Sequence, residues 1–323
     1  MFILGVGAAY PEVEISDLFL ASIGLLPSKE EAIILARVGV RSRRTSLPIE
    51  YIQTTKNLTA LKGREVASSS PTTLGESAAR QALERAGVSA DQVGLVIADC
   101  GTPHQSCPSE AQRIAGALGL KVPAYDVVAG EAALPFYLDM LSAWKPDRLP
   151  DYILFISANT PTQHVAYAGQ ALPAYLYGDA AAALVLSPRR KGKLKVGASY
   201  LGRHGALRAS SVVGRHLSFN AEPLLAQGDV ASAIAHGLKT LSGSRMDHII
   251  GPQLYGGEFQ SYETSCGLSQ GAMISGVERI GYSVGASHGV ALANIWDSIE
   301  PDAQIAVVHV GDGMVSGSML VGS

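Results

Sequence analysis

The side chains best suited to nucleophilic, redox or metal chemistry in this sequence are three cysteines and eight histidines. The cysteines, which are odd in number and show no paired spacing, are Cys100, Cys107 and Cys266. A disulfide framework and a zinc site are therefore not predicted, and a reducing, cytoplasmic setting is expected. The histidines without a partner at a diagnostic spacing include His104, His164 and His309. We assign them no function, and we predict no metal and no cofactor.

A run of positive charge is the second chemical signal. It consists of Arg37, Arg41, Arg43 and Arg44. Guanidinium groups at such a spacing could dock a phosphate-bearing or acidic partner. The alternative is a solvated charged loop, which is the more frequent explanation of such a run.

Composition excludes several classes of protein. The 323 residues are 47% hydrophobic and 16% charged, with 35 glycines and a formal net charge of −3. That is too apolar for a disordered chain and long enough for a large core. The slightly acidic balance argues against nucleic-acid binding, and no apolar run reaches the roughly 20 residues of a membrane span. Met1–Gly7 lacks the pattern of a signal peptide and predicts a first strand that ends in a glycine turn.

Short apolar runs that alternate with helical patterns predict an α/β fold. Val93–Asp99 and Tyr152–Ala158 have almost no polar alternation, which predicts strands buried on both faces. Gly75–Ala86 and Ser109–Leu118 have helical spacing, and each is followed by a glycine. A further helix is predicted from Glu131. Its dipole favours an ionised carboxylate there, unless a dry pocket raises the pKa of the carboxyl group.

The second half of the chain repeats this plan. Asp247–Ile250 matches the strand at Val93, and Pro301–Val310 matches the run that starts at Pro150. Each of the latter two runs precedes a glycine-marked turn and another apolar strand, Gly178–Leu186 or Gly317–Val321. A helix is expected before each Pro-Asp pair, the second from about Ser287. Internal duplication of βα units is the economical interpretation. The alternative is that all α/β proteins look self-similar at this level.

The predicted organisation has three parts. Residues 1–186 form the N-terminal half, residues 187–195 a short basic connector, and residues 196–323 the C-terminal half. Residues 11–73 depart from the repeat, and we expect this insertion to be rich in loops.

Five segments carry a resemblance to a known family, in the right order and over nearly the whole chain. They are Arg37–Arg41, Tyr125–Leu134, Tyr177–Leu186, Gly281–Ser287 and Val310–Gly317. Together they resemble the β-ketoacyl-acyl-carrier-protein synthase III family of thiolase-fold enzymes, which condense an acyl thioester with malonyl-carrier protein. The resemblance implies an α/β fold of two duplicated βαβ halves in layered α-β-α-β-α architecture. It also implies a homodimer, or a heterodimer with an active ketosynthase III.

The resemblance further implies that none of the family's three catalytic side chains is kept. Glu131 replaces the cysteine, Pro252 the histidine and Tyr282 the asparagine. A carboxylate is a poor acyl carrier, because its attack on a thioester would give an anhydride that is more reactive than the thioester. Pro252 has no N–H to donate to the enolate, and losing one such donor typically costs about 2.7–4 kcal/mol. We therefore do not expect Claisen condensation at this site.

The resemblance assigns five further candidates. Arg37 matches an arginine at the pocket mouth, and Gln253 matches a glutamine after the catalytic histidine. Cys107 replaces a phenylalanine that reaches into the partner's acyl tunnel, so the tunnel would widen, and we expect a small buried thiol. Asp312 could be a second acid facing the nucleophile position, although Gly-Asp-Gly is also a common tight turn. His288 could act as a base if it points to that position, and otherwise is simply packed.

Three functions remain open at this point. The first is a ketosynthase III-like partner subunit of an active condensing enzyme, in polyketide or fatty-acid-derived product biosynthesis. The second is an acyltransferase or thioester hydrolase that uses Glu131 as base or nucleophile and Tyr282 as proton donor. The third is binding of an acylated carrier protein through the arginine run. The expected ligand is an acyl carrier protein or acyl-CoA, with neither nucleic acid nor a membrane involved.

Overall fold

The computed structural model describes residues 1–203, 226–241, 246–311 and 314–323. The strands of its first half are β1 (Phe2–Ala9), β4 (Leu95–Asp99), β5 (Ala124–Asp126), β6 (Ile153–Asn159) and β7 (Ala180–Ser187). Those of its second half are β8 (Leu194–Arg203), β9 (His248–Ile250), β10 (Met273–Ile274), β11 (Gln304–Gly311) and β12 (Met314–Gly322). Within the described ranges these strands form one sheet in the order β10-β9-β11-β12-β8-β1-β7-β6-β4-β5.

The two halves of this sheet have the same topology. In the first half, β4 is parallel to β5 and β6, and β7 is antiparallel to β6 and β1. In the second half, β9 is parallel to β10 and β11, and β12 is antiparallel to β11 and β8. The half-sheets meet at β1 and β8 through two register pairs, Phe2–Lys195 and Ile3–Leu194. One strand plan used twice is the signature of the duplicated unit that the sequence predicts.

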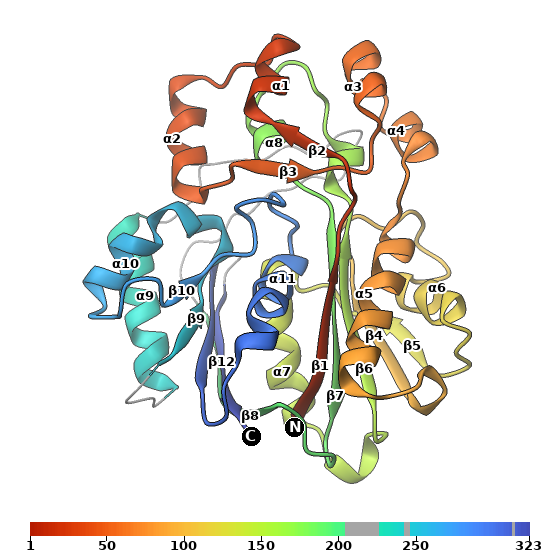
Figure 1. Ribbon diagram of the computed structural model, residues 1–323, viewed down its shortest axis with the longest axis vertical. Helices are drawn as coiled ribbons and strands as arrows, with labels where there is room; N and C mark the ends of the chain where they lie inside the picture. The colour runs from red at the N-terminus through yellow and green to blue at the C-terminus, as the bar shows by residue number, and fades with distance from the viewer. Residues whose placement is uncertain (204–225, 242–245, 312–313) are drawn as a thin grey trace.

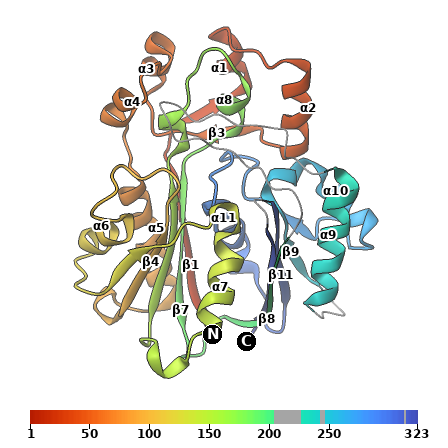
Figure 2. The same cartoon turned by 180° about the vertical axis from the view of Figure 1, so that it is seen from behind.

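Six helices build the layers around the half-sheets. They are α5 (Pro71–Ala86), α6 (Glu110–Ala117), α7 (Ala133–Ala143), α9 (Gln227–Thr240), α10 (Phe259–Ser265) and α11 (Ala286–Ile295). Helices α5 and α6 cover one outer side, α9 and α10 cover the other, and α7 and α11 lie between the half-sheets (Figures 1 and 2). The predicted α-β-α-β-α architecture is confirmed.

The two central helices hold the halves together. Helix α7 packs against β8, β11 and β12, whereas α11 packs against β1, β6 and β7, so each central helix contacts the strands of the other half. Leu134, Tyr137 and Leu141 of α7 belong to the same buried core as Leu292 of α11. Because sheet surrounds both helices, their sequences are apolar on nearly every face.

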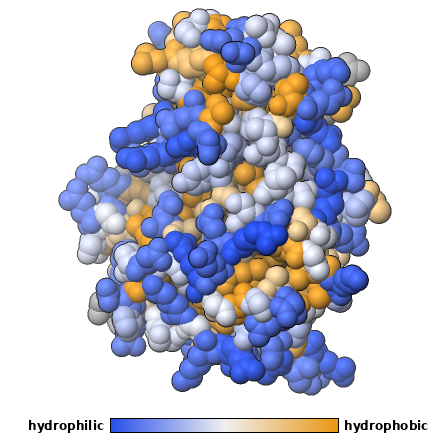
Figure 3. Space-filling model, turned by 45° about the vertical axis from the view of Figure 1, so that its right-hand side comes forward, coloured by the Kyte–Doolittle hydropathy of each residue, from blue (hydrophilic) through white to orange (hydrophobic). Residues whose placement is uncertain are grey.

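A smaller unit, the cap, sits above the sheets in Figure 1. Its elements are β2 (Glu14–Ser16), β3 (Ser42–Arg44), α1 (Asp17–Ser22), α2 (Lys29–Val38), α3 (Ile49–Thr55), α4 (Ala60–Val66) and α8 (Leu172–Leu176). The expectation of a loop-rich insertion over 11–73 is therefore wrong. Local signals specify helices there: α2 has a capping box made by Ser28 and Glu31 and ends at Gly39 in the left-handed conformation. Figure 3 shows apolar side chains gathered on this cap.

The first strand corrects a second expectation. β1 does not turn at Gly7 but continues to Ala9. A Cβ on Gly5 or Gly7 would lie 2.2 Å from a carbonyl oxygen of α5, at Ala82 or Ala78. These glycines therefore permit close approach of a helix to the strand.

Other boundaries agree more closely with the sequence. Helix α5 starts at Pro71, four residues before the predicted range, because Ser70 caps it, and it ends before Gly87 as expected. None of the helices in the described ranges combines the length and the apolar character needed to cross a bilayer.

Candidate functional site

Glu131 lies in a single 3-10 turn, η2 (Gly130–Ala132), that leads into α7. Gly130 adopts a left-handed φ of 59°, which a glycine accommodates without strain. Asp99, at the end of β4, holds this turn by accepting hydrogen bonds from the Ala129 N–H and the Ser157 hydroxyl, both at 2.8 Å. Burial raises the pKa of Asp99 to about 6, although these hydrogen bonds favour its charged form.

Tyr282 approaches Glu131 from a tightly packed loop. Its N–H donates to the Leu176 carbonyl at 2.8 Å. Val284 in this loop has a left-handed φ of 52°, which is unfavourable for a β-branched residue. A Cβ on Gly285 would lie 2.1 Å from Oδ2 of Asp99, so the loop presses on the same carboxylate that holds the η2 turn. This packing brings the Tyr282 hydroxyl to 3.1 Å from Glu131 Oε2, to which it donates.

Pro252 and Gln253 reach Glu131 from the second half. Pro252 precedes the 3-10 segment η5 (Gln253–Glu258). It has no N–H, but the N–H of the next residue, Gln253, donates to Glu131 Oε1 at 2.7 Å. The Gln253 side chain is fully buried and bonds to the backbone at Gly251 and Gly276. Gln253 thus lies in the site as a scaffold for the Glu131 carboxylate.

Two histidines complete what we call the Glu131 cluster, defined as Glu131, Gln253, Tyr282, His288 and His309. His309 Nδ1 lies 3.8 Å from Glu131 Oε1, and the rings of His288 and His309 meet edge to face with centroids 5.9 Å apart. One ligand atom each from Glu131, His288 and His309 lies within 4.8 Å of the other two. His288 therefore meets the condition set for it in the sequence, whereas His309 was missed. The sequence pattern that could have identified His309 as a site residue is its place as a lone polar residue in the apolar run of β11.

The electrostatics of the cluster favour a carboxylate that stays ionised. Burial would raise the pKa of Glu131, but hydrogen bonding to His309, nearby imidazole charge and the Gln253 N–H together outweigh it, and the pKa falls below its usual value. For His288, burial lowers the pKa to about 4 despite the attraction of Glu131. His288 is then neutral at pH 7, so we ascribe the low pKa of Glu131 to His309 and Gln253.

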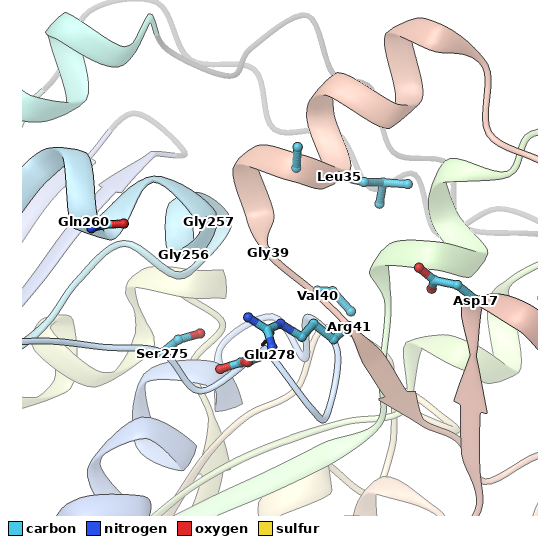
Figure 4. A pocket seen from close by; sticks show the side chains of 11 residues that line it. Asp17, Leu35, Gly39, Val40, Arg41, Gly256, Gly257, Gln260, Ser275 and Glu278 are labelled. Atoms are coloured by element: carbon cyan, nitrogen blue, oxygen red, sulfur yellow. Dashed lines mark ion pairs between the residues drawn. The ribbon is translucent and has the colours of Figure 1, made fainter. Parts of the chain in front are cut away.

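The cluster is closed to solvent. Glu131 is 1% exposed, Tyr282 5%, and the other three residues are fully buried. A surface pocket of about 440 Å³ lies instead between α2 and η5, where Arg41 and Glu278 face each other (Figure 4). No residue that lines this pocket belongs to the Glu131 cluster.

The arginine run is engaged within the chain. Arg37 pairs with Glu258 at 2.9 Å, and Arg44 pairs with Glu14 at 3.2 Å. Arg43 is 1% exposed and donates to Asp17 and to backbone carbonyls, so it cannot be a docking contact. Only the side chain of Arg41, at 81% exposure, is largely open among the four.

Two further candidates lie outside the cluster. Cys107 is exposed, in the loop between β4 and α6, so the expectation of a buried thiol is wrong. Polar and proline neighbours leave this loop at the surface. Asp312 lies outside the described residues. Cys100 is buried, and burial raises the pKa of its thiol, which disfavours a thiolate.

Sequence comparison finds β-ketoacyl-[acyl-carrier-protein] synthases III among the relatives of this chain. No protein-family model matches the chain. The β-ketoacyl-[acyl-carrier-protein] synthase III of Chlamydia caviae is 27% identical over 175 residues, which cover 54% of this chain and 46% of the relative. The enzyme of the same name from Salmonella typhi is 26% identical over 207 residues, covering 64% of this chain and 58% of the relative. The chain thus spans about half the length of the curated relatives it matches.

Solved structures share the fold over the whole chain. The 3-oxoacyl-[acyl-carrier-protein] synthase III of Aquifex aeolicus VF5 superposes with a TM-score of 0.78 at 18% identity, covering 100% of this chain and 99% of that one. The priming β-ketosynthase of the R1128 polyketide pathway gives 0.76 at 20% identity, covering 99% and 95%. AbyA1, a tetronic acid condensing enzyme, gives 0.77 at 19% identity and 99% of both chains.

Proposed function

We propose that this chain, which has the thiolase fold and resembles the β-ketoacyl-acyl-carrier-protein synthases III in sequence, does not condense acyl thioesters itself. Its proposed role is that of a partner subunit of an active condensing enzyme in fatty-acid or polyketide biosynthesis. A cytoplasmic location and an acyl carrier protein or acyl-CoA as the shared ligand are part of the same proposal.

The observation that best supports the loss of condensing activity is that both carboxylate oxygens of Glu131 are engaged in hydrogen bonds. The family resemblance gives it the position of the nucleophile, yet its two carboxylate oxygens already accept from Gln253 and Tyr282. It is 1% exposed, so a thioester carbonyl has no open approach to it. A carboxylate with a lowered pKa is also a weak base, which argues against the alternative of base catalysis by Glu131.

The decarboxylation half of the reaction lacks donors as well. Stabilising an enolate oxygen requires preorganised N–H or O–H groups aimed at it. Pro252 offers none, while the Tyr282 hydroxyl and the Gln253 N–H donate to Glu131 instead. Each missing donor costs about 2.7–4 kcal/mol of transition-state stabilisation. Two missing donors would slow this step by roughly four orders of magnitude or more.

The partner role is motivated by Cys107. Its side chain is exposed, at the position that the resemblance assigns to the residue reaching into a neighbouring subunit. A thiol there is smaller than a phenyl ring, so it would leave the neighbour's acyl tunnel longer or wider. The chain would then set acyl length in a subunit whose chemistry it does not perform.

Co-expression with an active synthase III from the same gene neighbourhood tests the proposal. We expect a heterodimer on size-exclusion chromatography, and we expect Cys107→Phe to shorten the acyl chains that the partner accepts. Cys266→Phe is the matched control and should leave the product profile unchanged. Recovery of only a homodimer, with no effect on the partner's products, would reject the proposal.

The enzyme alternative is tested separately on the purified chain. A panel of acyl-carrier and acyl-CoA thioesters should release no thiol, and Glu131→Cys alone should not create condensation, because the donors at the other two positions remain absent. Turnover that is lost in Glu131→Gln would favour a hydrolase or acyltransferase.

A further inference from the structure

We propose that Glu131, His288 and His309 form a binding site for a divalent transition metal ion, zinc foremost, at the seam between the two halves of the fold. The proposal is independent of the partner role, because it concerns what the cluster binds and not what the protein assembles with.

The ligand types and spacing fit such an ion. A carboxylate and two imidazoles are a ligand set that zinc and its neighbours accept. One ligand atom from each residue lies within 4.8 Å of the other two, and His309 Nδ1 lies 3.8 Å from Glu131 Oε1. Ligand atoms around tetrahedral zinc are separated by about 3.4 Å, given bonds of about 2.0–2.1 Å. A small inward movement of the side chains would therefore bring these three ligand atoms to the spacing that tetrahedral zinc requires.

Hydrogen bonds orient both imidazoles as they are oriented in metal sites. Nε2 of His309 lies 3.1 Å from the Gly311 carbonyl, and Nε2 of His288 lies 3.4 Å from the Val308 carbonyl. A carbonyl only accepts, so Nε2 carries the proton in each neutral ring and Nδ1 holds the lone pair. Metal-binding histidines typically donate their second N–H to a carbonyl or carboxylate in this way. Within the described residues, Nδ1 of the fully buried His288 meets no hydrogen-bond partner of ordinary geometry.

Glu131 and His309 already interact in the metal-free chain. His309 Nδ1 lies 3.8 Å from Glu131 Oε1, in a site that solvent does not reach. Bound zinc would take the place of a proton on Nδ1 and would balance the buried negative charge of the carboxylate. An imidazolium at His309 is the competing explanation for this contact, and the experiment separates the two.

The surroundings favour a structural role for the ion. The Gln253 N–H and the Tyr282 hydroxyl fix the carboxylate from behind, as outer-shell partners do. The ligands come from η2 in the first half and from α11 and β11 in the second, so the ion would link the two halves. Three protein ligands leave one position of a tetrahedral zinc ion unfilled, but the cluster is closed to solvent, so a substrate has no open approach to that position.

The test uses the full chain after treatment with a chelator. Titration with Zn²⁺ against a metallochromic indicator should give one equivalent per chain, and Co²⁺ should give the visible d–d spectrum of a nitrogen- and oxygen-ligated ion. His288→Gln and His309→Gln should each weaken Zn²⁺ binding by about 100-fold or more. His236→Gln, on the exposed face of α9, is the matched control and should bind as the parent does. Bound Zn²⁺ should also raise the melting temperature of the parent.

Three results would overturn the proposal. The first is binding well below one equivalent in the parent protein. The second is binding unaffected by both histidine substitutions, with folding of the variants verified by circular dichroism. The third comes from the parent alone, should a variant fail to fold: ¹⁵N NMR that finds both His309 nitrogens protonated at pH 7 in excess Zn²⁺ would establish the imidazolium instead.

Discussion

The parent protein is expected to lose stability as the pH rises from about 4 to about 6, and replacing Asp99 by Asn should remove that loss. Asp99 is fully buried behind the turn that carries Glu131. Burial raises its pKa from 3.8 to about 6, and the hydrogen bonds from Ala129 and Ser157 offset only part of that shift. Asn keeps the shape of the side chain and cannot ionise.

The sign and size of the effect follow from linkage between protonation and folding. Below pH 3.8 the carboxyl group is protonated in both states, and above about pH 6 it is ionised in both. Between these limits the folded state holds more protons than the unfolded state, so the free energy of unfolding falls as the pH rises. A shift of about 2 pKa units corresponds to about 3 kcal/mol. The parent should lose about that much relative to Asp99→Asn across the window.

Urea unfolding followed by circular dichroism between pH 3.5 and pH 8 measures this difference. Asp147→Asn, which removes an exposed carboxylate with the same change of net charge, is the control and should follow the parent. A difference between the parent and Asp99→Asn that is flat with pH, or that grows as the pH rises, would refute the reasoning.

Three further predictions concern packing, the cluster and the arginine run. Gly7→Ala places a methyl group 2.2 Å from a carbonyl oxygen of α5 and should lower the free energy of unfolding in urea by about 3 kcal/mol or more. In the control Gly116→Ala the new methyl group has no neighbour within 4 Å, so this change should be neutral or stabilising. Equal effects of the two substitutions would contradict the packing argument. Tyr282→Phe removes the hydroxyl donor to a buried carboxylate and should cost about 1.5–3 kcal/mol; an unchanged melting curve would mean that this hydrogen bond is not made. The Arg37 side chain is 20% exposed and paired, so Arg37→Ala should lower the free energy of unfolding by more than about 1 kcal/mol. The Arg41 side chain is 81% exposed, so Arg41→Ala should change the free energy of unfolding by no more than about 0.5 kcal/mol. The reverse order of the two effects would refute this assignment.

Most of the architecture could be predicted because it depends on local signals. The strands buried on both faces produce unbroken apolar runs, and β4 and β6 lie within about two residues of their predicted limits. Gly87 marks the end of a helix through its backbone conformation, which is a property of the residue itself. The repeated strand order could be predicted because both halves of the chain carry the same local sequence patterns.

The errors arise where tertiary contacts decide. Gly7 was interpreted as a turn because a sequence cannot show that a helix approaches the strand at that point. His309 carries no motif, and the packing of β11 against the η2 turn brings it to Glu131. Cys107 was expected to be buried from the average behaviour of cysteine, whereas an exposed loop decides its surroundings.

The thin connection between β1 and β8 has a mechanical consequence. Two register pairs join the half-sheets, while each central helix is embedded against the strands of the opposite half. The junction between the halves therefore depends on the side-chain packing of α7 and α11 far more than on hydrogen bonds within the sheet. Because Glu131 and His309 belong to different halves, the distance between them depends on the same packing.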